Sequence, residues 1–396
     1  MKRLRQAGVW RAALGACSAL LTACGREPAV DVTAELGAPL PILTQEELAR
    51  FRAGEALFNR VFSPAEGLGP MFNENQCSAC HTDPASGGTG EQKVVKATRF
   101  DGTACDLLAE AGGRNVRTQA TPAMQARGLD RETVPEAATE RGRFTVPFLF
   151  GLGLVEAIPE SEIASRADPD DRDRDGISGR MGRTPDGRMG RFGRKADFAT
   201  IEEFAAGALL LEMGLTSPLE PNEARANGQP LPQGVDPTPD PEMDARSLAL
   251  LVDFVRFLAP PAPRTPEWSV ARDSLARGER LFRRLGCEAC HVPVMTTSSQ
   301  IPSLDGKAVA LYSDLLLHDM GPALANVCGP GATPTELRTA PLMGLGARRV
   351  FLHDGRAYSV RDAILMHGGE AQRSRDAFAA LDYLEQLELI KFLDSR

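Results

Sequence analysis

The chain has 396 residues, of which 42% are hydrophobic and 25% charged, and its formal net charge is −8 at pH 7. This composition is ordinary for a globular protein with a hydrophobic core, and the length is typical of two or three domains. The acidic balance gives no electrostatic reason to bind nucleic acid or an anionic membrane surface, so we expect neither as a partner.

The N-terminus has the pattern of an export signal. Four basic residues precede an uncharged, mostly apolar run at residues 12–23, which is too short to span a bilayer but suits a signal peptide. The run ends in Leu-Thr-Ala-Cys at residues 21–24, which resembles the bacterial lipobox, whose cysteine is lipidated. We therefore predict a lipoprotein signal peptide over residues 1–24 with a lipid anchor at Cys24. A plain signal peptide cut near Ala23 is the alternative.

The residues after the signal indicate a destination and a tether. Gly25 follows the cysteine, where inner-membrane lipoproteins usually carry an aspartate, so we expect an outer-membrane lipoprotein on the periplasmic side. Residues 25–43 are rich in Pro and Ala and are interpreted as a tether. Thr44 followed by Glu47 forms a capping box, and the apolar spacing behind it predicts a helix that includes Phe58.

Further along, residues 217–241 hold seven prolines and are expected to form a long surface loop. An apolar stripe then predicts a helix over residues 244–258, and the prolines behind it indicate a linker at 260–268. No convincing alternating strand pattern is present, so we expect an all-α architecture with long loops. The domains are predicted at residues 44–259 and 269–396.

The chain contains an internal repeat. A Gly-Glu-x-Leu-Phe segment occurs at residues 54–58 and again at 278–282, each time before a Cys-x-x-Cys-His motif. Each motif is followed by a Thr-x-Pro turn and then by a helix with a capping residue, Thr200 in the first copy and Ser359 in the second. We interpret this order as two copies of one module.

The two Cys-x-x-Cys-His motifs carry the chemistry. Their residues are Cys77, Cys80 and His81 in the first copy and Cys287, Cys290 and His291 in the second. In such a motif the two thiols bond to haem vinyl groups and the adjacent histidine ligates the iron. A redox disulfide or half of a zinc site is the alternative for a lone Cys-x-x-Cys. A shared zinc site needs two pairs close enough to fold together, and these pairs are far apart. We predict two covalent c-type haems.

Two further cysteines, Cys105 and Cys328, remain after the motifs and the signal are assigned. Spare thiols often pair in an oxidising compartment, and this pair would join the two halves of the chain. The sequence leaves the pairing open, because it does not show how close the two residues lie.

The sixth ligand of each iron decides what each haem can do, since an open iron can bind peroxide and a doubly ligated one relays electrons. Aligning the two capped helices places His367 of the second copy at the position of Ala208 in the first. We predict that His367 ligates the second iron and that the first is open. His318 and Met320 are alternative ligands for the second iron, and His353 is expected to be structural or to contact a propionate.

Glu212 lies one turn beyond Ala208, among the apolar residues Leu209, Leu211 and Met213. A carboxyl in such surroundings would have a raised pKa and could carry protons for cleavage of an O–O bond. We predict Glu212 as the catalytic acid and base. A solvated helix carboxylate is the alternative.

A third site is suggested by an acidic loop. Asp171, Asp173 and Asp175 alternate, and Gly176 occupies the sixth position, as in the first half of a calcium-binding loop. Position twelve is Gly182 instead of the usual bidentate glutamate. We predict calcium here, with a solvated acidic loop as the alternative.

Several stretches resemble the bacterial di-haem oxidoreductase family of peroxidase-like proteins, which is related to the di-haem cytochrome c peroxidases. The most specific stretches are FGLGLVEAIP at residues 150–159, EMGLT at 212–216, LHDMGP at 317–322, LHDGR at 352–356 and HGGE at 367–370. The resemblance implies two cytochrome-c-like domains, with a low-potential N-terminal haem where peroxide reacts and a C-terminal haem that relays electrons. Calcium between the domains is typical of the relatives.

The resemblance also concerns the distal pocket, where the relatives use a Gln and a Glu on one helix. Glu212 matches the Glu, but the Gln position falls near Phe204, and Arg194 stands where relatives often carry an aromatic residue. Both are departures from the pattern of the relatives.

Three functions remain in view. The first is a peroxidase that takes electrons from a donor protein, such as a small cytochrome or a cupredoxin, at the second haem. The second is a two-haem electron carrier, which would need a methionine such as Met71, Met213 or Met320 on the first iron. The third is an oxidase of a protein partner, for which the few surface aromatic residues give little support.

Overall fold

The computed structural model describes residues 32–264 and 268–396. The predicted signal peptide, its lipid anchor at Cys24, the start of the tether and residues 265–267 of the predicted linker lie outside this part of the chain. Among the described helices, none is both long enough and apolar enough to cross a membrane.

The helices and strands occur as follows. The α-helices are α1 (Gln45–Phe58), α2 (Cys77–Cys80), α3 (Pro122–Gln125), α4 (Leu152–Glu156), α5 (Glu160–Ala164), α6 (Ile201–Ala208), α7 (Ala245–Phe257), α8 (Ser269–Arg284), α9 (Val360–Leu365), α10 (Gln372–Ala379) and α11 (Tyr383–Asp394). The strands are β1 (Met71–Phe72), β2 (Lys93–Phe100), β3 (Cys105–Asp106), β4 (Asn115–Val116), β5 (Gln119–Ala120), β6 (Glu140–Thr145), β7 (Gly182–Arg183), β8 (Met189–Gly190), β9 (Met295–Thr296), β10 (Ala308–Val309), β11 (Leu317–Asp319) and β12 (Glu336–Arg338).

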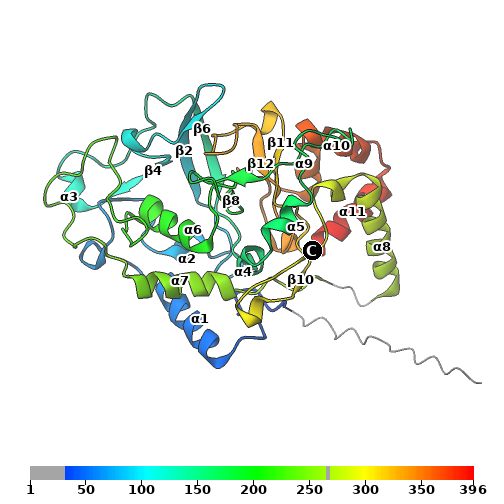
Figure 1. Cartoon of the computed structure of the whole chain (residues 1–396), viewed down its shortest axis with the longest axis horizontal. Helices are drawn as coiled ribbons and strands as arrows, with labels where there is room; N and C mark the ends of the chain where they lie inside the picture. The colour runs from blue at the N-terminus through cyan, green and yellow to red at the C-terminus, as the bar shows by residue number, and fades with distance from the viewer. Residues whose placement is uncertain (1–31, 265–267) are drawn as a thin grey trace, which may run out of the picture. The chain divides into compact units, whose positions relative to one another are not determined.

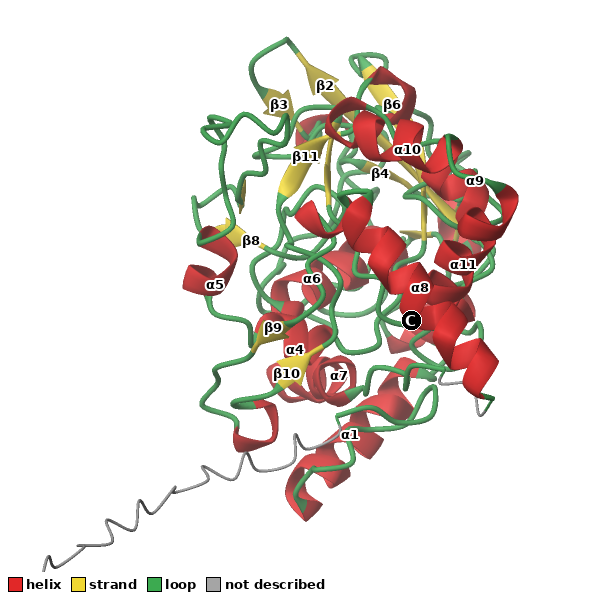
Figure 2. Ribbon diagram, turned by 90° about the vertical axis from the view of Figure 1, so that its right-hand side faces the viewer, coloured by secondary structure: helices red, strands yellow, loops and turns green. Residues whose placement is uncertain are grey.

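The expected all-α architecture is wrong, because small antiparallel sheets accompany the helices. The largest sheet is built around β2, which pairs with β3, β4 and β6. Figure 2 shows these strands gathered at the end away from α1 and α7. Most of the other strands are two or three residues long, which is too short for an alternating pattern. In β2, burial does not alternate along the strand, so the sequence shows no period of two.

The predicted helix starts are confirmed. The Thr44 hydroxyl accepts a hydrogen bond from the Glu47 amide, and the Glu47 carboxylate accepts one from the Thr44 amide, which completes the capping box of α1. Thr200 caps α6 and Ser359 caps α9 in the same way, each accepting from the amide three residues on. Residues 217–241 form no helix, as expected, and only a single bridge interrupts the loop.

The repeat in the sequence corresponds to a repeat in the structure. Helix α1 packs on α7, and α8 packs on α11 (Figure 1). Gly54 of α1 lies against the backbone of Leu250, and Gly278 of α8 lies against the backbone of Glu388. A Cβ atom at either glycine would collide with the carbonyl of its partner. The repeated glycine is therefore required for the close approach of each helix pair.

Each helix pair buries the phenylalanine that ends the repeated segment. Phe58 of α1 packs against Phe254, with ring centroids 4.7 Å apart. Phe282 of α8 packs against Phe392, with centroids 5.6 Å apart. The burial of such rings contributes much of the stability of a core. The two modules thus use the same aromatic anchor on the N-terminal side of their cysteine motifs.

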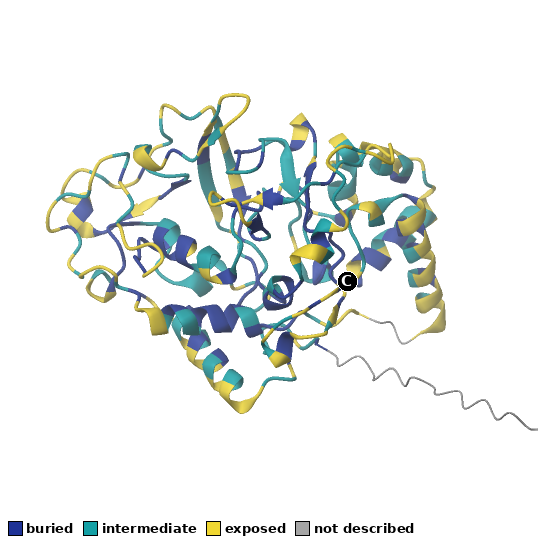
Figure 3. Cartoon of the chain, in the orientation of Figure 1, coloured by how far each residue is buried: buried dark blue, intermediate teal, exposed yellow. Residues whose placement is uncertain are grey.

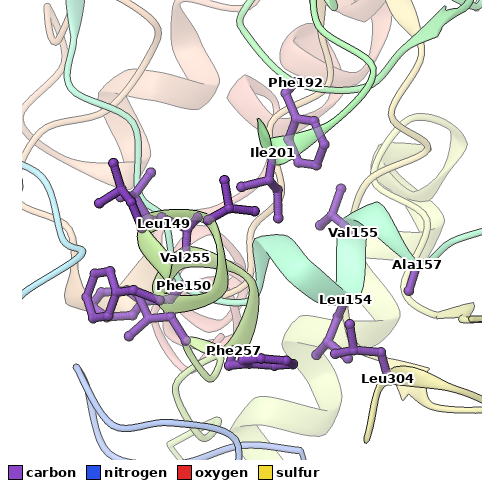
Figure 4. Packing of buried hydrophobic residues seen from close by; sticks show 14 of the residues in the cluster. Leu149, Phe150, Leu154, Val155, Ala157, Phe192, Ile201, Val255, Phe257 and Leu304 are labelled. Atoms are coloured by element: carbon purple, nitrogen blue, oxygen red, sulfur yellow. The ribbon is translucent and has the colours of Figure 1, made fainter. Parts of the chain in front are cut away.

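Among the described residues, buried apolar side chains form one large cluster, a second cluster built mainly from α8, α10 and α11, and two small ones. Helix α7 is buried along most of its length, whereas α8 exposes its outer face (Figure 3). Within the large cluster, Leu154 of α4 packs beside Leu304, and Val155 points toward Ile201 (Figure 4). Residues of both predicted domains contribute to this cluster. The domain boundaries stay a prediction.

A disulfide joins the two halves. Cys105 of β3 is bonded to Cys328, with Cα atoms 5.8 Å apart and a separation of 223 positions in sequence. The sequence left this pairing open, and the structure forms it. Cys328 is buried, and its amide donates to the hydroxyl of Thr98 on β2. The bond therefore ties the β2 sheet to the second module.

We predict that replacing both Cys105 and Cys328 with alanine lowers the free energy of unfolding by about 2–5 kcal/mol, because the bond closes a long loop in the unfolded chain. Urea denaturation of the oxidised protein measures the change, with thiol labelling as the control for the oxidation state. A double variant as stable as the wild-type protein would contradict this role.

Candidate functional site

Two large cavities each contain one of the cysteine motifs. Cavity 1 has a volume of about 1830 Å³ and is lined by Cys77, Cys80 and His81. Cavity 2 has a volume of about 1370 Å³ and is lined by Cys290 and His291. Both volumes include space that opens to solvent at the mouth of the cavity.

The two motifs share one backbone hydrogen bond. The first motif forms the short helix α2, and the amide of His81 donates to the carbonyl of Cys77 at 3.1 Å. The second motif begins with a 3-10 turn, and the amide of His291 donates to the carbonyl of Cys287 at 2.9 Å. In the first motif both cysteines and the histidine line cavity 1, whereas in the second Cys290 and His291 line cavity 2 and Cys287 packs against the apolar cluster of α8 and α11.

The two motif histidines are held in the tautomer that can bind a metal. Nδ1 of His81 donates to the carbonyl of Gly88 at 3.0 Å, and Nδ1 of His291 donates to the carbonyl of Tyr312 at 3.0 Å. Because a carbonyl can only accept, the hydrogen is held on Nδ1 and the lone pair of Nε2 is free. Burial lowers the pKa of both imidazoles to about 4, so both are neutral at pH 7. The arrangement fits iron ligation.

The motif cysteines fit thioether bonds better than a thiolate site. None of the four is joined in a disulfide. Burial raises the pKa of Cys77, Cys80 and Cys287 to about 12, and it also raises the pKa of Cys290. Zinc and redox disulfides use the thiolate, which these surroundings disfavour.

The two candidate ligands of the second iron differ in their hydrogen bonds. Nδ1 of His367 donates to the carbonyl of Ala363 at 2.7 Å, which leaves Nε2 free at cavity 2. His318 has both nitrogens engaged, Nε2 with Asp314 at 2.8 Å and Nδ1 with Glu370 at 2.7 Å. Burial alone would lower the pKa of His318, but its hydrogen bonds outweigh burial and raise that pKa to about 12. His318 is therefore a cation without a free lone pair.

Cavity 1 has no equivalent histidine. Ala208 ends α6 and lines cavity 1. When the two modules are aligned, it occupies the position of His367. The chain then continues into a π-helical turn, η3 (Leu209–Met213), which carries Glu212 into the wall of the same cavity. Such turns occur often at functional sites, because they turn one side chain out of the regular helical spacing.

Glu212 is held by two amide side chains. Its carboxylate accepts a hydrogen bond from Asn73 at 2.7 Å and another from Asn115. Burial raises the pKa of Glu212, and the hydrogen bond from Asn73 and the charge of Lys96 offset part of that rise. A carboxyl with a raised pKa in the wall of a cavity is suited to exchange a proton with a ligand there.

Sequence reasoning missed the partners of Glu212. Asn73, Lys96 on β2, Arg114 and Asn115 on β4 come from the chain around the first module's sheet. The last three of these line cavity 1. They have no counterpart in the second module, so the repeat could not reveal them.

The other residues considered for the first cavity are placed as follows. Phe204 and Met213 line cavity 1, and Sδ of Met213 lies 3.9 Å from Sγ of Cys77. Met71 is fully buried in a separate cluster around Ala120. Arg194, at the position of the relatives' aromatic residue, lines both cavities.

Two more residues line cavity 2. Met320 lies in its wall, and the amide of Met320 donates to the carbonyl of Thr335 at 3.0 Å. His353 is 5% exposed, and neither of its ring nitrogens has a hydrogen-bond partner. An orphaned buried imidazole of this kind is expected to bond to something in the cavity.

The acidic loop brings its three carboxylates together. Oxygens of Asp171, Asp173 and Asp175 lie within 4.8 Å of one another, on a mostly exposed surface. Their other contacts are backbone amides of the same loop, including those of Gly176 and Ile177. The calcium site stays a prediction.

Comparison with known proteins gives one family. Residues 136–396 match the family model described as "Di-haem oxidoreductase, putative peroxidase". The match begins after the first cysteine motif. No curated protein matches the chain.

Among solved structures, hydrazine synthase from Kuenenia stuttgartiensis is 13% identical, with a TM-score of 0.42, and the alignment covers 100% of this chain and 98% of that one. The diheme peroxidase BthA from Burkholderia thailandensis is 16% identical, with a TM-score of 0.42 and coverages of 93% and 89%. A MauG-like protein associated with microbial copper homeostasis is 14% identical, with a TM-score of 0.39 and coverages of 92% and 94%.

The histidines of cavity 2 allow a direct test. We predict that His367→Ala converts one haem from low spin to high spin, because it removes the sixth ligand. His318→Gln is the matched variant and leaves that haem low spin, because His318 has no free lone pair. Optical absorption of the ferric protein measures both. A loss of the low-spin signal in the His318 variant alone would reverse the assignment.

Proposed function

The chain belongs to the di-haem oxidoreductase family, and from that premise we propose that it reduces hydrogen peroxide at cavity 1 with electrons that arrive through cavity 2. The single observation that carries the proposal is the difference between the cavities. Cavity 2 contains two histidines whose Nε2 is free, His291 and His367. Cavity 1 contains His81 alone, because Ala208 occupies the position that corresponds to His367.

The haems are proposed to be covalent, through Cys77 and Cys80 in cavity 1 and through Cys287 and Cys290 in cavity 2. Bound haem supplies an iron that can bind and reduce peroxide where one axial position is open, and an electron relay where both are ligated. The neutral histidines and the protonated thiols of the two motifs support this assignment.

Glu212 is proposed to move the proton. As a carboxylate it accepts a proton from one oxygen of hydrogen peroxide, and as an acid it returns that proton to the other oxygen, which leaves as water. Two electrons from the donor and two protons from solvent complete the conversion of one peroxide to two waters. Asn73 and Asn115 hold the carboxylate in place, and Lys96 limits the rise of its pKa.

An electron-transfer cytochrome with no substrate is the other candidate. It needs a strong second ligand in cavity 1, and Met213 is the methionine of the sequence-based set that lines it. Met213 packs on the thiol of Cys77, which is one of the two groups proposed to attach the haem. The hydrogen-bonded, buried carboxyl of Glu212 in the same cavity favours the enzyme, because a relay has no use for a proton carrier.

We also propose the electron donor, a calcium site and the location of the protein. The electron donor is a small cytochrome or cupredoxin, and calcium at Asp171, Asp173 and Asp175 stiffens the loop. That loop reaches cavity 2 through Ser178, whose hydroxyl donates to Glu370, the partner of His318. Export to the periplasmic side, with a lipid anchor at Cys24 on the outer membrane, agrees with a disulfide between the two halves.

We predict that Glu212→Gln lowers kcat/KM for hydrogen peroxide by about 10²–10⁴-fold, because proton transfer contributes that much. In the wild-type protein kcat/KM falls as the pH drops through the raised pKa of Glu212, since the protonated acid cannot accept a proton, and the variant loses this dependence. Glu202→Gln, at an exposed position on α6, is the control and keeps wild-type kinetics. Equal rates in all three proteins would sink the proposal.

A further inference from the structure

Three arginines lie between the two cavities and line both of them. They are Arg194, which follows β8, Arg338, which ends β12, and Arg348, which follows the last of the repeated turns. The three come from separate segments of the chain, and their guanidinium groups meet at the wall that the cavities share.

All hydrogen-bond acceptors of these guanidinium groups among the described residues are neutral oxygens. Arg194 donates to the hydroxyl of Thr145 at 3.1 Å. Arg338 donates to the carbonyls of Gly193 and Thr339. Arg348 donates to the carbonyl of Pro341, and its Nε is buried without a partner.

The surroundings of the three arginines disfavour their positive charges. Burial lowers the pKa of Arg194 and Arg338 to about 10 and that of Arg348 to about 9. The charge of Arg194 lowers the pKa of the other two further, which shows that the three cations repel one another. All three are half-buried where they face the cavities, and a cation withdrawn from water normally has an anionic partner.

Elsewhere the same chain follows that rule. Arg117 is almost fully buried, and it donates to both carboxylate oxygens of Glu132, at 3.0 and 2.6 Å. None of the three cavity arginines has a carboxylate within hydrogen-bond distance. Asp354 acts on Arg194 from farther away, Asp197 and Asp314 act on Arg338, and no carboxylate acts on Arg348. An anion held in the cavities would give all three a direct partner. The imidazole of His353, which lines cavity 2 without a hydrogen-bond partner, would be a further contact for such an anion.

We propose that Arg194, Arg338 and Arg348 form one cationic bridge that binds the propionates of both haems. This inference rests on the proposed occupancy of the cavities by haem. Each haem carries two propionates, which are anions that guanidinium groups bind through paired hydrogen bonds. One bridge would then hold the carboxylates of both cofactors, while the cysteines of the two motifs would hold their vinyl groups.

A shared bridge has a consequence for electron transfer. Reduction of a haem adds one negative charge, and a nearby cation favours it. Because the same arginines face both cavities, the removal of one positive charge lowers the reduction potential of both haems together. An arginine that served one haem alone would shift only that haem.

The test is redox titration of the holoprotein carrying Arg348→Gln, followed by optical absorption of the two haems, after the haem content is measured. Both midpoint potentials are expected to fall, each by about tenfold in the reduction equilibrium for a charge about 10 Å away at an effective dielectric of about 20. Tenfold corresponds to about 59 mV for one electron. Arg349→Gln is the matched control, because Arg349 is exposed and pairs with Asp83.

Arg348→Lys keeps the positive charge, so both midpoint potentials are expected to stay close to their wild-type values. If Arg348→Gln loses haem, Arg194→Gln is the second variant, and it is expected to lower both midpoint potentials. A shift of one potential only, or of neither, overturns the bridge. Fewer than two haems in the wild-type protein would instead overturn the proposed function, so the two failures are distinguishable.

Discussion

The hydrogen bond at Nδ1 decides what His81, His291, His318 and His367 can do in the two cavities, whereas His353 has no such bond. In His81, His291 and His367 the acceptor is a backbone carbonyl, so the proton is fixed on Nδ1 and Nε2 can bind iron. In His318 both nitrogens face carboxylates, which hold the ring as a cation. The distribution of these bonds gives cavity 2 two ligands and cavity 1 one, and the proposed division of labour follows from that difference.

The two modules are copies in their support and different in their chemistry. Gly54 and Gly278 bring equivalent helix pairs together, and the phenylalanines behind them anchor equivalent motifs. In the second module His367 follows the end of α9, and in the first module the equivalent helix, α6, ends in Ala208. The first module adds a sheet around β2, and this addition supplies Lys96 and Asn115 to the wall near Glu212. The surroundings of Glu212 therefore come from a sheet of the first module, and the repeated helix pair does not supply them.

Some of this could be predicted from the sequence because it is local or repeated. The cysteine motifs are contiguous, the caps at Thr44 and Ser359 depend on residues three apart, and the repeat itself aligns His367 with Ala208. The sheets could not be predicted, since strands of two or three residues have no period. The partners of Glu212 and the arginine bridge could not be predicted either, because they meet only after distant segments fold together.

The most direct test of the account is low-temperature electron paramagnetic resonance of the ferric holoprotein. The difference between the cavities predicts one high-spin haem beside one low-spin haem, and the high-spin signal should respond to cyanide. Two low-spin signals that ignore added cyanide and peroxide would contradict the open site in cavity 1 and leave an electron carrier.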